Sequence, residues 1–279
     1  MAIKDLLVHL DETPASQARL QAGLALAARC EAQVTALYLL AEPFLPGMGG
    51  RHLPAELLRE HLAHGEAEAE TILAAARAEA DRHGVNLAVL RGSGPVDRLP
   101  QLLARHARHS DLTLVGQPDL ATHGVDDTAL TEAAFMDSGR PALVIPHEHA
   151  AMLPPRRALV AWDGSREAAR ATSDAIPLLR FAEQVLVLVV DARDDGRLGD
   201  TPGSALTAHL VRHAVKAELR QVASGSASVA ETLLGHAGEL QADLLVMGGY
   251  GHSRLREMML GGTTRSMLEH MTVPVLFSH

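Results

Sequence analysis

The sequence predicts an α/β protein built from two tandem, doubly wound (Rossmann-like) domains, each with a five-stranded parallel sheet, related by pseudo-two-fold symmetry. Short apolar segments alternate with alanine- and leucine-rich helical segments along the 279 residues, as in parallel sheets that helices cover. The same series of segments occurs twice. We expect a first domain at residues 1–147, a linker at 148–156 that holds Pro154 and Pro155, and a second domain at 157–279.

Three pairs of matching segments support the duplication. An apolar strand leads to Asp11 in the first half and to Asp163 in the second. Further along, residues 92–116 match residues 224–248, and residues 140–145 match residues 273–277. Because the matches come in the same order, we interpret the chain as a tandem repeat, with each copy near the commonest domain size.

The apolar segments place the individual elements. In the first half they predict strands at residues 3–10, 33–40, 86–90, 112–116 and 142–145. In the second half they predict strands at residues 158–162, 184–190, 219–223, 244–247 and 274–277. Helices are expected to start at Thr13, with Pro14 in the first helical position, and at Ser165, Ser204, Ser228 and Thr263. Pro177 should kink or end the helix that starts at Ser165.

An insertion at residues 43–65 sets the first half apart from the second. It is rich in Pro, Gly and His and precedes a charged helical stretch with Glu66, Glu68 and Glu70. These glutamates indicate a solvated helix face. A partner surface is the alternative, and nothing in the sequence decides between the two.

The composition argues against several classes of protein. A net charge of −9 and an isoelectric point near 5.9 disfavour a nucleic-acid partner, since phosphate backbones require clustered Lys and Arg. No stretch approaches the roughly twenty apolar residues of a membrane span. The amino-terminal residues enter the first strand directly, so no signal peptide is expected. The single cysteine, Cys30, fits a reducing compartment, and we expect a cytoplasmic protein.

Two glycine clusters follow the apolar strand that ends near Met247. The first contains Gly248 and Gly251, and the second is Gly261–Gly262. Glycine lets a backbone amide approach an anion closely, because no Cβ stands in the way. The second cluster leads directly into a helix, whose amino-terminal end attracts phosphate. The pattern therefore predicts a phosphate-binding loop, with an ordinary glycine-rich turn as the alternative.

The spacing of these glycines resembles the nucleotide-binding signature of the universal stress protein family. In that signature Gly-x-x-Gly is followed, after nine residues, by Gly and Ser or Thr; Gly248, Gly251 and Gly261 match it, and Gly262 replaces the hydroxyl residue. The resemblance implies a site for ATP or another adenine nucleotide, with Mg²⁺ left open, in which Thr263 or Thr264 could supply the hydroxyl. It also implies adenosine contacts from the first two strands of the second half. The candidate nucleotide-binding residues are Ala161, Trp162, Asp163, Val189, Met247, Gly248, Tyr250, Gly251, Gly261, Gly262, Thr263 and Thr264.

Two of these residues have competing interpretations. Asp163 could accept hydrogen bonds from a ribose or an adenine amine, or it could cap the following helix together with Ser165. Val189 matches a family position whose backbone recognises adenine, and core packing is its alternative role.

The first half lacks the features of a phosphate loop. Pro118 and Asp119 follow its matching strand, and Asp126 and Asp127 come shortly after. A proline removes an amide, and carboxylates repel phosphate. We therefore expect one nucleotide per chain, although Asp11 is retained.

The leading hypothesis is an adenine-nucleotide-binding stress-response or regulatory protein with its site in the second half. The alternatives are a slow ATP hydrolase that uses the same pocket and an interaction module without nucleotide. The hydrolase is not the leading hypothesis, because the sequence carries none of the common catalytic motifs. The pairs His61/His64 and His209/His213 share helix faces, but no third ligand stands at motif spacing, so no metal site is expected. We expect the last strands of the two halves to pair within the chain, and leave homodimer formation open.

Overall fold

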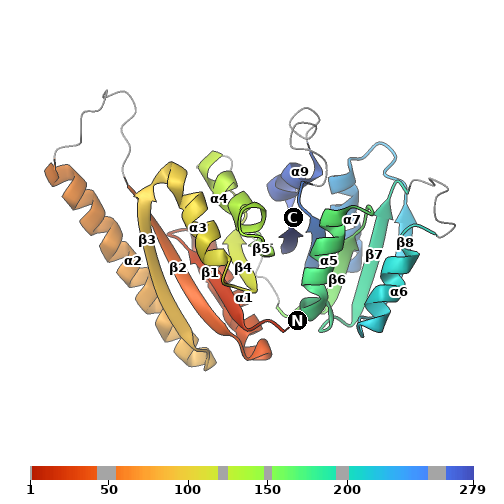
Figure 1. Ribbon diagram of the computed structural model, residues 1–279, viewed down its shortest axis with the longest axis horizontal. Helices are drawn as coiled ribbons and strands as arrows, with labels where there is room; N and C mark the ends of the chain where they lie inside the picture. The colour runs from red at the N-terminus through yellow and green to blue at the C-terminus, as the bar shows by residue number, and fades with distance from the viewer. Residues whose placement is uncertain (1, 43–54, 119–124, 148–152, 193–200, 251–261) are drawn as a thin grey trace.

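The computed structural model describes residues 2–42, 55–118, 125–147, 153–192, 201–250 and 262–279. The chain forms one ten-stranded sheet with helices on both faces (Figure 1). The strand order is β3-β2-β1-β4-β5-β10-β9-β6-β7-β8. The first-half strands are β1 (Asp5–Leu10), β2 (Gln33–Glu42), β3 (Leu87–Pro95), β4 (Leu112–Gly116) and β5 (Ala142–Ile145). The second-half strands are β6 (Arg157–Ala161), β7 (Gln184–Val190), β8 (Ala217–Val222), β9 (Leu244–Gly248) and β10 (Val275–Ser278).

The helices divide between the two faces of the sheet. One buried cluster joins one face to α1 (Pro14–Cys30), α2 (Ala55–His83), α5 (Arg166–Leu179) and α6 (Ser204–Arg212). A second cluster joins the other face to α3 (Leu99–Ala107), α4 (Val125–Met136), α7 (Val229–Leu240) and α9 (Thr263–His270). Both faces are therefore covered, which explains why the central strands are nearly continuous apolar runs rather than alternating ones.

The two halves meet at the centre of the sheet. Eight of the neighbouring strand pairs are parallel, and the ninth, β5 with β10, is antiparallel, with Val144 opposite Val275 and Ala142 opposite Phe277. The expected pairing of the last strands is confirmed. The pairing merges the two expected five-stranded sheets into one continuous sheet.

Most predicted elements lie within a few residues of the observed ones. Thr13 and Ser165 are helix N-caps as expected, and α5 ends at Leu179, just after Pro177. The main difference is β3, which was expected to end at residue 90 and continues to Pro95. It continues because β2 is also longer than expected and pairs with it as far as Glu42 opposite Pro95. None of the helices in the described part of the chain has an apolar stretch that could span a bilayer.

Candidate functional site

A cavity lies at the carboxyl ends of the second-half strands, between β6 and β9. The chain runs from β6 outward to β7 and β8, then returns to β9 on the other side of β6, so this is the point where the strand order reverses. Ligands of doubly wound sheets bind in the crevice at such a point. The lining residues are Ala161, Trp162, Asp163, Ser165, Ala168, Leu188, Val190, Val229, Leu233, Met247, Gly248, Thr263 and Thr264.

The structure brings most of the predicted site residues together. Seven of the twelve line the cavity: Ala161, Trp162, Asp163, Met247, Gly248, Thr263 and Thr264. Gly262 is the N-cap of α9, next to the cavity. Gly251 and Gly261 lie outside the described residues. The cavity measures about 130 Å³, which is below the roughly 300–1,000 Å³ of common ligand pockets, so the space that the described residues enclose is smaller than a whole nucleotide.

Val189 does not line the cavity. Its side chain is 4% exposed, whereas its neighbours Leu188 and Val190 both line the cavity. The reason is the strand period of two, which sends side chains 188 and 190 to one face and 189 to the other. Leu188 and Val190, together with Val229 and Leu233 of α7, are cavity residues that the sequence analysis did not single out. The strand period in β7 could have identified the first two.

The first turn of α5 forms one wall of the cavity. The Ser165 hydroxyl accepts a hydrogen bond from the backbone N–H of Ala168 at 3.1 Å, and Asp163 Oδ1 accepts one from the N–H of Ser165 at 2.9 Å. Ser165 is thus the cap of α5, and Asp163 holds the turn that precedes it. Asp163 also lines the cavity with an exposed carboxylate, so both interpretations of this residue remain compatible with its position.

Gly248 allows β9 and α5 to approach each other closely. A Cβ placed on Gly248 would lie 2.6 Å from the backbone nitrogen of Ala168 and 2.6 Å from the carbonyl carbon of Glu167. Both are backbone atoms and cannot rotate away. This position therefore requires glycine for packing, independently of any contact between its amide and an anion.

The amino-terminal ends of α7 and α9 also border the cavity, but they are capped differently. In α7, Ser228 and Glu231 form a reciprocal capping box, and the hydrogen bond from the Ser228 N–H lowers the pKa of Glu231. In α9 the N-cap is Gly262, which makes no side-chain capping hydrogen bond, and the first turn carries no acidic residue. Within the described chain, the positive end of α9 thus has no side-chain cap beside the cavity, which favours an anion there.

Thr263 and Thr264 have different environments at this helix end. Thr264 is 2% exposed, and its hydroxyl accepts a hydrogen bond from the N–H of Tyr250 at 3.1 Å. Thr263 is partly exposed and is the first residue of α9. Thr263 is therefore the better placed of the two to present a hydroxyl to a ligand.

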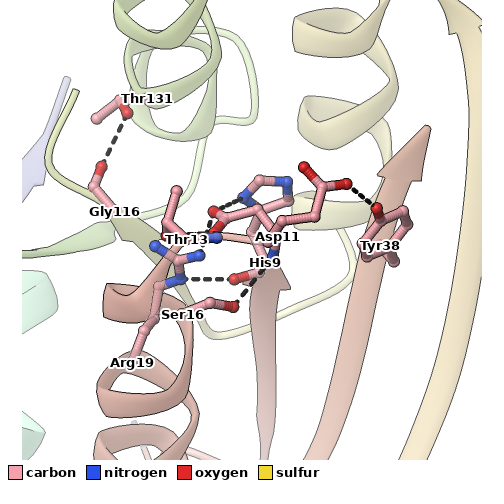
Figure 2. Close-up of polar contacts among 9 residues, drawn as sticks. His9, Asp11, Thr13, Ser16, Arg19, Tyr38, Gly116 and Thr131 are labelled. Atoms are coloured by element: carbon pink, nitrogen blue, oxygen red, sulfur yellow. Dashed lines mark hydrogen bonds and ion pairs between the residues drawn. The ribbon is translucent and has the colours of Figure 1, made fainter. Parts of the chain in front are cut away.

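Large polar residues gather at the matching strand ends of the first half (Figure 2). His9, two residues before Asp11, corresponds to the cavity residue Ala161 before Asp163, whereas Tyr38 in β2 corresponds to Val189 in β7, which faces away from the cavity. The side chain of Arg19, 1% exposed, reaches from α1 to these strand ends, where it donates to the His9 carbonyl at 2.6 Å and pairs with the carboxylate of Asp11. Arg19 corresponds to Ala171 in the second half, so a large charged side chain stands where the second half has a small one.

The electrostatics of this first-half cluster favour a neutral histidine beside an ion pair. Burial and the charge of Arg19 lower the pKa of His9 to about 4. Burial acts to raise the pKa of Asp11, but Arg19, His9 and the hydrogen bonds from Thr13 outweigh it and hold that pKa below its usual value. Burial and the hydrogen bond to Glu12 raise the pKa of Tyr38.

Helix α4 is a further difference between the first half and the second half, where the phosphate loop is predicted. It has 12 residues, whereas the corresponding α9 has 8, and Asp126 and Asp127 lie in its first turn. Thr131 of α4 donates a hydrogen bond to the carbonyl of Gly116 at 3.0 Å, which ties the helix to the end of β4 (Figure 2). Pro118 lies two residues after the end of β4, and Asp119 lies outside the described residues.

The histidine pairs do not extend to metal sites in the described part of the chain. The rings of His209 and His213 lie 4.5 Å apart on α6. Among the described residues, no group of three or more His, Cys, Asp or Glu side chains is placed to hold a metal ion.

Comparison with known proteins links the second half to one family. The model of the Universal stress protein family matches residues 155–279. A universal stress protein of Synechocystis sp. is 43% identical over 54 residues, which are 16% of this chain and 19% of that protein. The chain thus covers less than a fifth of the length of this curated relative.

Solved structures resemble the chain over nearly its whole length. A universal stress protein from Archaeoglobus fulgidus superposes with a TM-score of 0.74 at 17% identity, covering 98% of this chain and 95% of its own. A protein of unknown function from Pseudomonas aeruginosa superposes with a TM-score of 0.60 at 13% identity, covering 99% of this chain and 92% of its own. At these identities the likeness shows that the fold is shared over both halves.

Proposed function

Because residues 155–279 match the universal stress protein family, we propose that this chain is a regulatory protein that binds one adenine nucleotide in its second half. The binding site is the cavity between β6 and β9, and the first half serves as a domain without nucleotide. The observation that carries the proposal is the amino-terminal end of α9, which no described side chain caps and which borders this cavity.

The lining of the cavity suits the two chemically different parts of a nucleotide. Ala161, Leu188, Val190 and Leu233 provide apolar surface for a base, and Asp163 provides a carboxylate that can accept hydrogen bonds from ribose hydroxyls. Thr263 and the open amides of α9 can donate hydrogen bonds to phosphate. We propose ATP, ADP or AMP as ligands, with Mg²⁺ bound through the phosphates of ATP.

We propose binding without efficient hydrolysis. Phosphoryl transfer requires metal ligands and a positioned water or nucleophile. The one carboxylate that lines the described part of the cavity, Asp163, already accepts a hydrogen bond from the backbone of Ser165. Its position at the start of α5 suits ribose recognition better than catalysis.

The test is to purify the protein, release any small molecule by denaturation and identify it by mass spectrometry. Titration calorimetry with ATP, ADP and AMP, each with and without Mg²⁺, then measures affinity. A co-purified adenine nucleotide, or saturable binding of one of the three, is the expected result. The proposal is wrong if none of them binds the pure protein at millimolar concentration.

A further inference from the structure

The side chain of Tyr250 points toward the first half of the chain rather than into the cavity of the second half. Its hydroxyl donates a hydrogen bond to the carboxylate of Glu132, and its ring stacks on Phe135 with centroids 6.4 Å apart and planes 14° apart. Glu132 and Phe135 both belong to α4. A residue predicted to contact nucleotide is therefore held by the other half of the molecule.

The backbone of Tyr250 is linked to the cavity at the same time. Its φ angle is +51°, a left-handed conformation that bulky residues keep only where their surroundings hold them. Its N–H donates to the hydroxyl of Thr264, and Thr264 lines the cavity in the first turn of α9. The contacts of Tyr250 thus connect α4 to the helix end that borders the proposed phosphate site.

Gly249 shows how closely the first half approaches this segment. A Cβ on Gly249 would lie 2.6 Å from Cε2 of the Phe135 ring. The ring is itself fixed, because Phe135 is fully buried and stacks on Phe277 with centroids 5.1 Å apart. A displacement of α4 that moved the Phe135 ring would therefore also displace the backbone of Gly249 and Tyr250.

We propose that Tyr250 is a positioning residue through which the first half sets the nucleotide affinity of the second half. Glu132 and Phe135 hold the Tyr250 side chain, Tyr250 holds its backbone against Thr264, and Thr264 fixes the start of α9 where phosphate binds. This inference rests on the proposed function, since it concerns the same cavity. It assigns to the first half a role that does not require a ligand of its own.

Two substitutions remove the contact, and two others serve as controls. Tyr250→Phe deletes the hydroxyl but keeps the ring stack, and Glu132→Ala deletes the acceptor. Glu132→Gln keeps an oxygen that can accept the hydroxyl, so it should restore most of the affinity. Thr131→Val, on the neighbouring residue of α4, removes the hydrogen bond to Gly116 without touching Tyr250.

Affinity for ATP and AMP is measured by calorimetry, and thermal unfolding is measured without nucleotide. We expect Tyr250→Phe and Glu132→Ala each to weaken binding about fivefold, at the lower end of couplings between distinct sites. The double variant should bind no more weakly than either single variant, because both remove the same interaction. Thr131→Val should lower thermal stability while leaving the affinity unchanged.

The outcomes separate this inference from the proposed function. If the unaltered protein binds neither nucleotide, both are wrong. If it binds and the two variants retain full affinity, or if Thr131→Val weakens binding equally, only the inference is wrong. If either variant fails to fold, amide hydrogen exchange of the unaltered protein is measured with and without ATP. Because coupling between two sites is reciprocal, ATP should then slow exchange in residues 125–136. Unchanged exchange there would overturn the inference.

Discussion

The ring of Phe135 in α4 stacks on the ring of Phe277 in β10, with centroids 5.1 Å apart and an angle of 21° between the planes. One ring comes from the first half and the other from the second, and both side chains are fully buried. The two halves therefore share a hydrophobic core at the point where β5 pairs with β10. Neither half can lose this contact without exposing apolar surface of the other.

Phe135→Ala should destabilise the whole chain. Removal of a buried phenyl ring typically costs about 3–5 kcal/mol of the free energy of unfolding. The space left by the missing ring would lie between the two halves. We therefore expect differential scanning calorimetry to show a single thermal transition, shifted to lower temperature. Two separate transitions, with one unshifted, would contradict the shared core.

Ala161→Phe should abolish nucleotide binding by filling the cavity. Ala161 is partly exposed at the end of β6 and lines the cavity, so a phenyl ring there occupies the space proposed for the base. Ala208→Phe is the matched control, since Ala208 is exposed on α6 away from the cavity. Calorimetric titration with ATP should detect binding to the control alone. Equal affinity of the two variants would remove this cavity from the nucleotide site.

The glycines of the second half should respond differently to substitution. Gly248→Ala should lower stability by about 1–3 kcal/mol, because its Cβ meets the backbone of α5 and overpacks the contact. Gly251→Glu, outside the described residues, should instead abolish nucleotide binding and leave stability without nucleotide unchanged, since it places a carboxylate in the predicted anion-binding loop.

The control for the added carboxylate is Gly235→Glu. Gly235 is exposed on α7, and a Cβ there meets nothing within 4 Å. Urea unfolding and ATP titration of the three variants separate packing from binding. Normal ATP affinity of Gly251→Glu would show that this loop does not bind phosphate.

One nucleotide per chain is the expected stoichiometry. In the first half, Arg19 pairs with Asp11 at the strand ends, His9 stands where the second half has Ala161, and α4 begins within the segment that corresponds to the glycine loop. Native mass spectrometry of the nucleotide-bound protein should show a single added nucleotide mass. Saturation at two per chain would mean that the cluster around Arg19 opens to admit a ligand.

Stability should fall as the pH is lowered from about 6.5 to about 4 because of His9. The pKa of His9 is about 4 in the folded protein, whereas the unfolded value is 6.5. Between these values the unfolded chain binds a proton that the folded chain does not, so acid favours unfolding. Asp11 adds to the effect at still lower pH, since its folded pKa is depressed and its pairing with Arg19 is lost on protonation.

His9→Leu removes this titration and puts an apolar side chain at the buried position. Between pH 7 and pH 4.5 the variant should lose about 2–3 kcal/mol less of its free energy of unfolding than the unaltered protein. This is the free energy that corresponds to the pKa shift of about two and a half units, less the part that develops only below pH 4.5. Urea unfolding at both values measures it. The same pH dependence in both proteins would show that His9 titrates normally.

The sequence predicted the strands well where burial on both faces leaves a simple signature. Leu112–Gly116, Ala142–Ile145 and Gln184–Val190 were placed correctly, because a short uninterrupted apolar run between helical segments is typical of a strand covered on both faces. The extension of β3 was missed, since residues 92–95 contain glycines and a proline and become a strand only by pairing with β2. Tertiary pairing there overrides local propensity.

The candidate site was predictable only in part. The glycine pattern, the strand end at Asp163 and the resemblance to the universal stress protein family together identified seven of the cavity residues. The orientation of Tyr250 was not predictable, since it depends on a helix more than a hundred residues earlier in the chain. Nor does the sequence show that Arg19 is buried, because an arginine on a helix is usually exposed.

The antiparallel pair of β5 and β10 also limits how one chain can join another. Both strands have neighbours on each side, so within the described sheet the unpaired edges are those of β3 and β8, at its two ends. Along β8, Glu218 and Arg220 alternate with less polar residues, and charges on an edge strand oppose the addition of a further strand. Two copies that paired at their β8 edges would each still have an unpaired β3 edge. Further copies could add there, so strand addition would favour open-ended assemblies over a discrete dimer. A discrete dimer of this protein is therefore expected to form through its helices, which leaves the sheet a self-contained unit.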